Sequence, residues 1–153
     1  MTSTRLRWSF LMAVSLAVLL ISPSCGLITG PGPGLNIVAS ISQQSAESIT
    51  FRIGVENTGS KAETLDFGSS QFFDIEVRTA SGALVWRWST DKIFLDIVWG
   101  LDLDPGESSI QETVWDLTND FQRLLPHGTY RAKVFITSQP RDGDLVSEVF
   151  LNI

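Results

Sequence analysis

The sequence has few of the residues that catalytic and metal sites need. Its 153 residues include one cysteine, Cys25, and one histidine, His127. A single cysteine excludes an intramolecular disulfide, and the two residues together fall short of a four-ligand zinc site. A Ser-His-Asp arrangement would have to use His127, which stands in the turn-like sequence Leu-Pro-His-Gly-Thr. We therefore expect a protein that is not an enzyme and that has no catalytic residue, metal or cofactor.

Acidic side chains are the remaining candidates for a metal site. Asp102, Asp104 and Glu107 surround a Pro-Gly turn, and Asp142 and Asp144 flank a glycine. Calcium prefers several oxygen ligands on a flexible loop, but neither group has the spacing of the common calcium-binding loop. Aspartate and glycine are also ordinary turn residues. The turn interpretation is therefore favoured.

Basic residues are also scarce. The chain has 11 Lys and Arg against 17 Asp and Glu, and its net charge is −6. Nucleic-acid binding depends on clustered Lys and Arg, and basic clusters likewise attract a domain to anionic lipid. The charge balance therefore excludes nucleic acid as a partner, and it excludes a domain that lies flat on a membrane.

The N-terminal segment, residues 1–24, is typical of a signal peptide. Arg5 and Arg7 precede an apolar run over residues 8–21, which is shorter than the roughly 20 residues that span a bilayer. Cys25 follows the small residue Ser24, as at the lipidation site of a lipoprotein, and ordinary cleavage nearby is the alternative. The sequence thus predicts an exported protein. It is either a lipoprotein held to the membrane by lipid on Cys25 or a periplasmic or extracellular protein.

A Gly- and Pro-rich tether over residues 25–34 leads to one domain, residues 35–153. In this domain short runs alternate apolar with polar residues, and turn residues separate the runs. The pattern predicts an all-β fold, an immunoglobulin-like antiparallel β-sandwich of about seven or eight strands. A helical turn within residues 116–125 is the one expected exception. The approach to Tyr130 also resembles a tyrosine corner, in which the hydroxyl bonds to the backbone upstream.

A β-hairpin is predicted within residues 67–94. Its two strands alternate apolar with polar residues around a Ser-Gly turn, with Phe73, Ile75 and Val77 before the turn and Leu84, Trp86 and Trp88 after it. A shared face of Leu, Trp and Trp is more often core than surface, so we expect both tryptophans to be largely buried and structural. A sugar-binding face is the alternative. For that role Trp99, in an irregular stretch, is the tryptophan expected to be exposed.

The order of residues in this hairpin, SSQxFD followed by GxxVWRWSxDKxF, resembles the BsuPI family, named for an intracellular proteinase inhibitor. The resemblance extends to an upstream strand that ends in Asn, an L-x-P-G-E turn, a Trp-Asp pair and a G-x-Y strand start. The residues that carry it, which we expect to be mostly structural, are Asn57, Phe73, Asp74, Gly82, Trp86, Trp88, Ser89, Phe94, Pro105, Gly106, Trp115 and Tyr130.

The resemblance implies a non-catalytic domain that binds a protein, with a serine protease as the candidate partner. Such a domain inhibits by presenting a stiff loop to the protease cleft. The candidate partner-binding loop is formed by Gln139, Pro140, Arg141 and Asp142, and an ordinary hairpin loop is the alternative for these residues. Two other functions stay open at this point: an envelope adhesion or assembly scaffold, and a carbohydrate-binding β-sandwich module.

Overall fold

A computed structural model describes residues 34–139 and 145–153 of the chain. The predicted signal peptide, the tether up to residue 33 and Cys25 lie outside these residues. The described part is all-β, as predicted, and contains nine strands: β1 (Leu35–Gln44), β2 (Ile49–Asn57), β3 (Glu63–Phe67), β4 (Phe73–Thr79), β5 (Leu84–Arg87), β6 (Trp99–Leu103), β7 (Ser108–Trp115), β8 (Thr129–Ile136) and β9 (Val146–Asn152). No helix of these residues has the length and apolar character that crossing a membrane requires.

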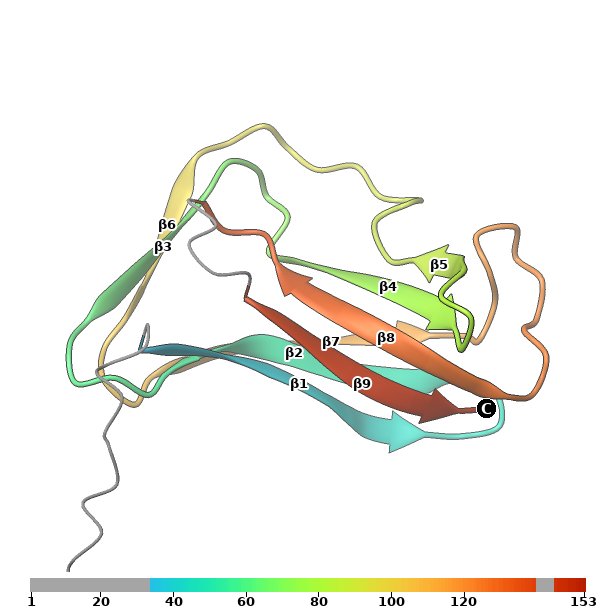
Figure 1. Cartoon of the computed structure of the whole chain (residues 1–153). Helices are drawn as coiled ribbons and strands as arrows, with labels where there is room; N and C mark the ends of the chain where they lie inside the picture. Colours follow the sequence, from blue (N-terminus) through green and yellow to red (C-terminus); the bar gives the residue numbers. More distant parts are fainter. Residues whose placement is uncertain (1–33, 140–144) are drawn as a thin grey trace, which may run out of the picture.

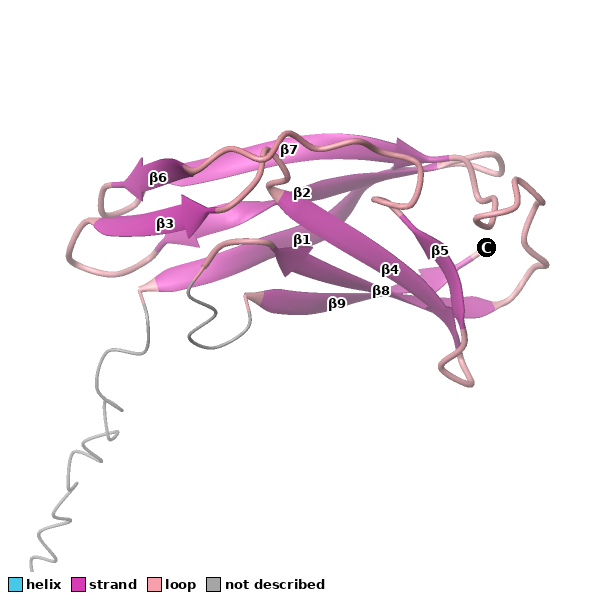
Figure 2. Ribbon diagram, turned by 90° about the horizontal axis from the view of Figure 1, so that it is seen from above, coloured by secondary structure: helices cyan, strands magenta, loops and turns pink. Residues whose placement is uncertain are grey.

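The strands form two main antiparallel sheets and one short ribbon. One sheet has the order β1-β2-β7 and the other has the order β5-β4-β8-β9, while β3 pairs with β6. The two main sheets face each other as a sandwich, and β1 contacts β9 along one side (Figure 1). The β3–β6 ribbon lies at one end of the sandwich, where it rises from the side of β2 and β7 toward the side of β4 (Figure 1 and Figure 2).

The core lies between the two main sheets and follows from the period-two pattern of three strands. Every second residue of β2 is fully buried from Ile49 to Val55, and the same alternation buries Ile75 and Val77 of β4 and Val134 of β8. Side chains on a strand alternate between faces, so one face of each strand supplies the core. The predicted sandwich is confirmed in this respect. The immunoglobulin-like detail stays a prediction.

The pairings between distant strands hold the sandwich together. β2 lies between its chain neighbour β1 and the remote β7, and β4 lies between β5 and the remote β8. Gly54 of β2 lies opposite Ile110 of β7, and a Cβ atom at Gly54 would overlap the carbonyl oxygen of Ser109. A glycine is needed here because the backbones approach too closely for any side chain.

A buried asparagine fixes the junction between the sandwich and the ribbon. The Asn57 side chain is fully buried; its Nδ2 donates to the carbonyl oxygens of Lys61 at 2.7 Å and Leu103 at 2.8 Å, and its Oδ1 accepts from the Gly59 N–H. Its backbone oxygen accepts from the N–H of Gly106, which has a φ of 81°. A buried amide with all these partners stabilises one geometry of the junction.

The structure differs from the sequence prediction in the helical turn expected within residues 116–125, which is wrong. Instead, Thr118 forms an isolated bridge with Leu124, and Leu117 and Gln122 have φ angles of 62° and 56°, outside the helical region. Asparagine competes for backbone groups with its side chain and so favours turns over helix interiors. Here the Oδ1 of Asn119 accepts two N–H groups of the turn.

The structure also tests the predicted tyrosine corner and the predicted apolar face of the hairpin. The Tyr130 hydroxyl donates to the carbonyl oxygen of Pro126 at 2.8 Å, which is the bond expected of the predicted corner. The prediction that Leu84 shares the buried face of Trp86 is wrong, because Leu84 is exposed. The register shifts between Val77, opposite Trp86, and Arg78, opposite Leu84. A bulge of this kind breaks the alternation of faces.

Candidate functional site

The segment that joins β5 to β6 exposes a group of large apolar side chains. Ile93 is 96% exposed, Leu95 65%, Ile97 45% and Val98 87%. We call residues 92–98 the apolar segment; it runs along the outside of the molecule with no strand or helix of its own (Figure 1). Single exposed apolar residues are ordinary, but a contiguous group is typical of an interaction site.

The N-terminal half of the apolar segment rests on one tryptophan. The Phe94 ring lies with its centroid 5.8 Å from that of Trp88, and the Lys92 Nζ lies 4.8 Å from the Trp88 ring centroid. Trp88 in turn packs on the buried Phe73 at 4.2 Å, and its Nε1 donates to the Thr113 hydroxyl at 2.9 Å. This half of the segment is therefore held by the β-sandwich core.

The C-terminal half is held by the loop between β3 and β4. Leu95 donates its N–H to the Ser70 hydroxyl and accepts from the Ser70 N–H, both at 2.9 Å. Beyond the segment, the Trp99 Nε1 donates to the Ser69 carbonyl oxygen at 2.7 Å, and its ring stacks on Phe67 at 4.2 Å. The apolar segment is thus fixed at both ends and near its middle while its apolar side chains face solvent.

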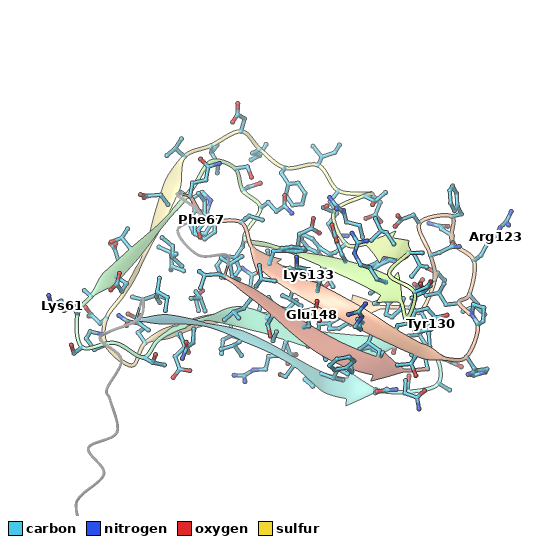
Figure 3. The ribbon with its side chains drawn as sticks, in the orientation of Figure 1. Lys61, Phe67, Arg123, Tyr130, Lys133 and Glu148 are labelled. Carbon is cyan, nitrogen blue, oxygen red and sulfur yellow. The ribbon has the colours of Figure 1, made fainter. Side chains whose placement is uncertain are left out.

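A second exposed apolar group lies at residues 118–124, which we call the braced loop. Phe121 is 82% exposed and Leu124 is 76% exposed. The Asn119 Oδ1 accepts the N–H groups of Phe121 at 2.9 Å and Arg123 at 3.0 Å. Figure 3 shows Arg123 of this loop at the end of the molecule opposite Lys61. The Asp120 N–H donates to the Val85 carbonyl oxygen, and the Asp120 carboxylate accepts the Arg87 N–H, so the loop is also tied to β5.

The outer face of the four-stranded sheet carries a row of charges instead of an apolar group. Glu76 is buried and accepts from Arg78, with Nη2 at 2.6 Å, and from Arg87. Lys133 of β8 lies between two acidic residues of the row: it is opposite Glu76 of β4 on one side and opposite Glu148 of β9 on the other (Figure 3). Paired charges across strands stabilise a sheet, so this row is structural.

One carboxyl beside the apolar segment has a shifted pKa. The ammonium of Lys92, hydrogen-bonded to Asp91 at 3.1 Å, holds the pKa of that carboxyl below its usual value. Asp91 is therefore ionised at neutral pH. Within residues 34–139 and 145–153, no three His, Cys, Asp or Glu side chains are grouped so that they could hold a metal ion.

Several residues of the family signature are brought together. The Asp74 carboxylate accepts the N–H and the hydroxyl of Ser89, at 3.2 and 2.8 Å. Trp86 stacks on Trp115 with centroids 5.2 Å apart. Gly82 lies in the β4–β5 turn, and Pro105 precedes Gly106 in the turn before β7. These contacts join the hairpin to the rest of the core.

The two tryptophans of the hairpin are less buried than predicted, since Trp86 and Trp88 line a surface pocket together with Trp115. Trp86 and Trp88 are half-buried against the core, Trp86 on Trp115 and Trp88 on Phe73. Trp99, expected to be the exposed tryptophan, is half-buried and lies nearly parallel to Phe67, with an interplanar angle of 9°. The expectation for Trp99 is wrong because β6 pairs with β3 and brings the indole onto the Phe67 ring.

The predicted partner-binding loop is described only at its first residue. The Gln139 N–H donates to the Asp66 carbonyl oxygen, and these two residues form an isolated bridge. Pro140, Arg141 and Asp142 lie outside the described residues. His127 is exposed and makes no side-chain hydrogen bond within the described part of the chain.

The sequence analysis missed the apolar segment. Residues 93–99 are apolar except Asp96, and such a run is typical of a buried strand. The run predicts an irregular strand within residues 93–103, whereas only Trp99–Leu103 forms β6. One feature of the sequence distinguishes this segment from a half-buried strand. The alternation of apolar and polar residues ends after Phe94, so apolar residues lie on every side of the backbone.

The fold and the apolar segment define the class of protein: an antiparallel β-sandwich that displays an anchored segment, an architecture common among binding domains. The chain belongs to the BsuPI family, described as an intracellular proteinase inhibitor, whose model matches residues 37–141. The resemblance found in the sequence is confirmed.

The family description corrects one prediction. It places the inhibitor inside the cell, which contradicts the exported location, whether membrane-anchored, periplasmic or extracellular. That prediction is wrong. It depended on the composition of residues 1–25 alone, a part of the chain that the family match does not include.

The comparison with curated proteins gives no match. Among solved structures, the chain is similar to beta-glucuronidase 2 of Bacteroides uniformis (18% identity, 78% of this chain, 13% of that chain, TM-score 0.41). It is also similar to beta-glucosidase 3B of Thermotoga neapolitana (17%, 77%, 15%, TM-score 0.42) and to a beta-glucosidase of Kluyveromyces marxianus (17%, 78%, 14%, TM-score 0.39). The chain spans between 13% and 15% of the length of these enzymes. At these TM-scores the likeness carries no argument about function.

Proposed function

We propose that this domain binds a serine protease and inhibits it through the apolar segment without catalysing a reaction. The observation that carries the proposal is the exposure of Ile93, Leu95, Ile97 and Val98 in one segment whose neighbours are anchored to the sandwich. The family description supplies the class of partner.

A protease cleft binds a peptide as an extended chain. Hydrogen bonds to the peptide backbone supply affinity, and pockets for the side chains supply specificity. A segment that already has a defined shape loses less conformational entropy on binding than a free chain does. The anchors at Trp88, Ser70 and Trp99 supply that shape.

The proposal includes no catalysis because of the position of the single histidine, His127. His127 is exposed on the loop before β8 and has no carboxylate or hydroxyl hydrogen-bonded to its ring within the described part of the chain. A nucleophile with its base within hydrogen-bond reach is the arrangement that covalent catalysis uses. Binding, by contrast, needs only the exposed surface.

The loop at Pro140, Arg141 and Asp142 stays a proposed second contact. Its first residue, Gln139, bridges to Asp66, which lies opposite Gly100 at the start of β6. The loop therefore leaves the sandwich beside the strand that follows the apolar segment. A carbohydrate-binding module is not proposed, because the indoles it would use are stacked on other rings.

The test is to measure inhibition of a panel of serine proteases by the wild-type domain and by two variants. In the first variant Ile93, Leu95, Ile97 and Val98 are all changed to Ser. In the matched control, the exposed apolar residues of the braced loop, Phe121 and Leu124, are changed to Ser. We expect inhibition by the wild type and the control, and a loss of inhibition in the first variant with an unchanged melting temperature. A wild-type domain that inhibits no protease at micromolar concentration would contradict the proposal.

A further inference from the structure

We infer that Ile93 is the side chain that enters the primary specificity pocket of the proteinase, and that this pocket accepts a large aliphatic side chain. The inference rests on the proposed function and adds the chemical class of the partner's pocket. Three properties of Ile93 carry it: its exposure, its unpaired backbone and the anchors on both of its neighbours.

Exposure singles out Ile93 first. At 96% it is the most exposed large apolar side chain in the described part of the chain. An apolar side chain that projects fully into water gains the most when a partner's pocket covers it, because the hydrophobic contribution grows with the apolar area removed from water. Dominant contacts of this kind sit in well-packed, desolvated pockets.

The backbone of Ile93 is also available. Within the described residues, neither the N–H nor the C=O group of Ile93 has a hydrogen-bond partner, and the same holds for Phe94. Leu95, in contrast, has both backbone groups bonded to Ser70, and the Ile97 N–H donates to the Leu95 carbonyl oxygen. Pairing with a cleft needs free backbone groups, so Leu95 and Ile97 are poorly suited to it.

Val98 is the remaining alternative, and its position argues against it. It directly precedes Trp99, which is paired with Phe67 at the start of β6. A protease that paired with the chain on both sides of Val98 would have to compete with this ladder. No strand constrains Ile93 in this way, since β5 ends at Arg87.

The residues on both sides of Ile93 are held by the same indole. The Lys92 ammonium lies over the Trp88 ring, and the Phe94 ring packs against it. The Lys92 N–H also donates to the Ser89 carbonyl oxygen at 3.2 Å. With both neighbours fixed on Trp88, the Ile93 side chain points away from the sandwich, and little further ordering is needed when a partner binds.

The chemistry of isoleucine then selects the pocket. A pocket with a charged group at its base would leave that charge buried and unpaired against an aliphatic side chain, which is strongly unfavourable. A hydrophobic pocket gains the apolar contact without that penalty. The partner is therefore a proteinase that cleaves next to large apolar residues, and not one that cleaves next to Arg or Lys.

The test is to replace Ile93 by charged residues and to measure which proteases the domain then inhibits. Wild type, Ile93→Asp, Ile93→Arg and the braced-loop control Leu124→Arg are each titrated against a subtilisin-type, a chymotrypsin-type and a trypsin-type protease. We expect Ile93→Asp to raise the inhibition constant for the protease with the apolar pocket by roughly 30-fold or more, the scale of a dominant interface residue. We expect Ile93→Arg no longer to inhibit the protease with the apolar pocket and to inhibit the trypsin-type enzyme instead. Leu124→Arg is expected to leave both the inhibition and its preference unchanged, because Leu124 lies outside the apolar segment.

The outcomes separate this inference from the proposed function. If both Ile93 variants inhibit like the wild type while the fourfold Ser variant does not inhibit, the inference is overturned and the function stands. If the wild type inhibits no protease, both fall. Thermal unfolding of each variant shows whether the domain is folded, and we expect no shift because Ile93 contacts solvent and not the core.

Discussion

The apolar segment and the braced loop expose similar side chains on different backbones. The backbone of the braced loop is bonded within the domain, since Asn119 accepts the N–H groups of Phe121 and Arg123 and the Asp120 N–H donates to the Val85 carbonyl oxygen of β5. The apolar segment is held from outside, by Trp88 and by Ser70. A loop whose backbone N–H groups are already bonded within the domain offers a partner mainly side chains, whereas the apolar segment also offers the backbone groups of Ile93 and Phe94, which are free within the described residues. This difference is the reason to assign protease binding to the apolar segment.

The largest expected effect comes from removing the anchor of the apolar segment. Trp88→Ala should lower the free energy of unfolding by about 3 kcal/mol, the lower end of the range for a buried ring because Trp88 is only half-buried. The inhibition constant should rise about tenfold, since the segment loses its preorganised shape. Chemical denaturation and a protease titration give the two values. Unchanged inhibition in a folded Trp88→Ala domain would remove the anchor argument.

The corresponding change in the braced loop should affect stability alone. Asn119→Ala leaves the N–H groups of Phe121 and Arg123 without their acceptor and should destabilise the domain by about 1–2 kcal/mol. Inhibition should be the same as in the wild type at a temperature where both are folded. If inhibition fell as much as in Trp88→Ala, the two regions would not differ in function.

A smaller effect is expected at Ser70. Ser70→Ala removes the hydroxyl that accepts the Leu95 N–H, while the backbone bond from Ser70 to Leu95 remains. The free energy of unfolding should fall by about 1 kcal/mol or less, because this contact is exposed. Amide hydrogen exchange at Leu95 should become faster, while exchange at Phe121 in the braced loop should not change.

The smallest effect is expected at Lys92. Lys92→Met keeps the apolar stem and removes the ammonium over Trp88, which should destabilise the domain by about 0.5 kcal/mol. The pKa of Asp91, now held low by Lys92, should return upward toward its usual value. A depressed carboxyl pKa contributes stability that is lost as the pH falls through it. NMR titration of Asp91 in the two proteins measures the difference.

The sequence predicts those strands of the fold whose alternation reflects burial on one face. β2 and β4 show the clearest alternation of apolar and polar residues, and both were predicted as strands. The pairing of β2 with β7 and of β4 with β8 has no local signal, because it joins residues far apart in the chain. The apolar segment was missed for a related reason: residues from Ile93 to Val98 are as apolar as a core strand, and only the tertiary structure leaves them in water.

The double anchoring of the apolar segment bears on what happens if the protease cuts it. Trp88 holds the chain before Ile93 through Lys92 and after it through Phe94, and Ser70 holds it at Leu95. Hydrolysis of the peptide bond between Ile93 and Phe94, the bond next to the side chain assigned to the specificity pocket, would create two new chain ends, each still attached to the sandwich. Tethered ends stay at an effective concentration on the order of millimolar or higher, so neither fragment diffuses out of the cleft and the bond is readily remade. The clipped domain would remain bound, which is how a chain with the shape of a substrate acts as an inhibitor.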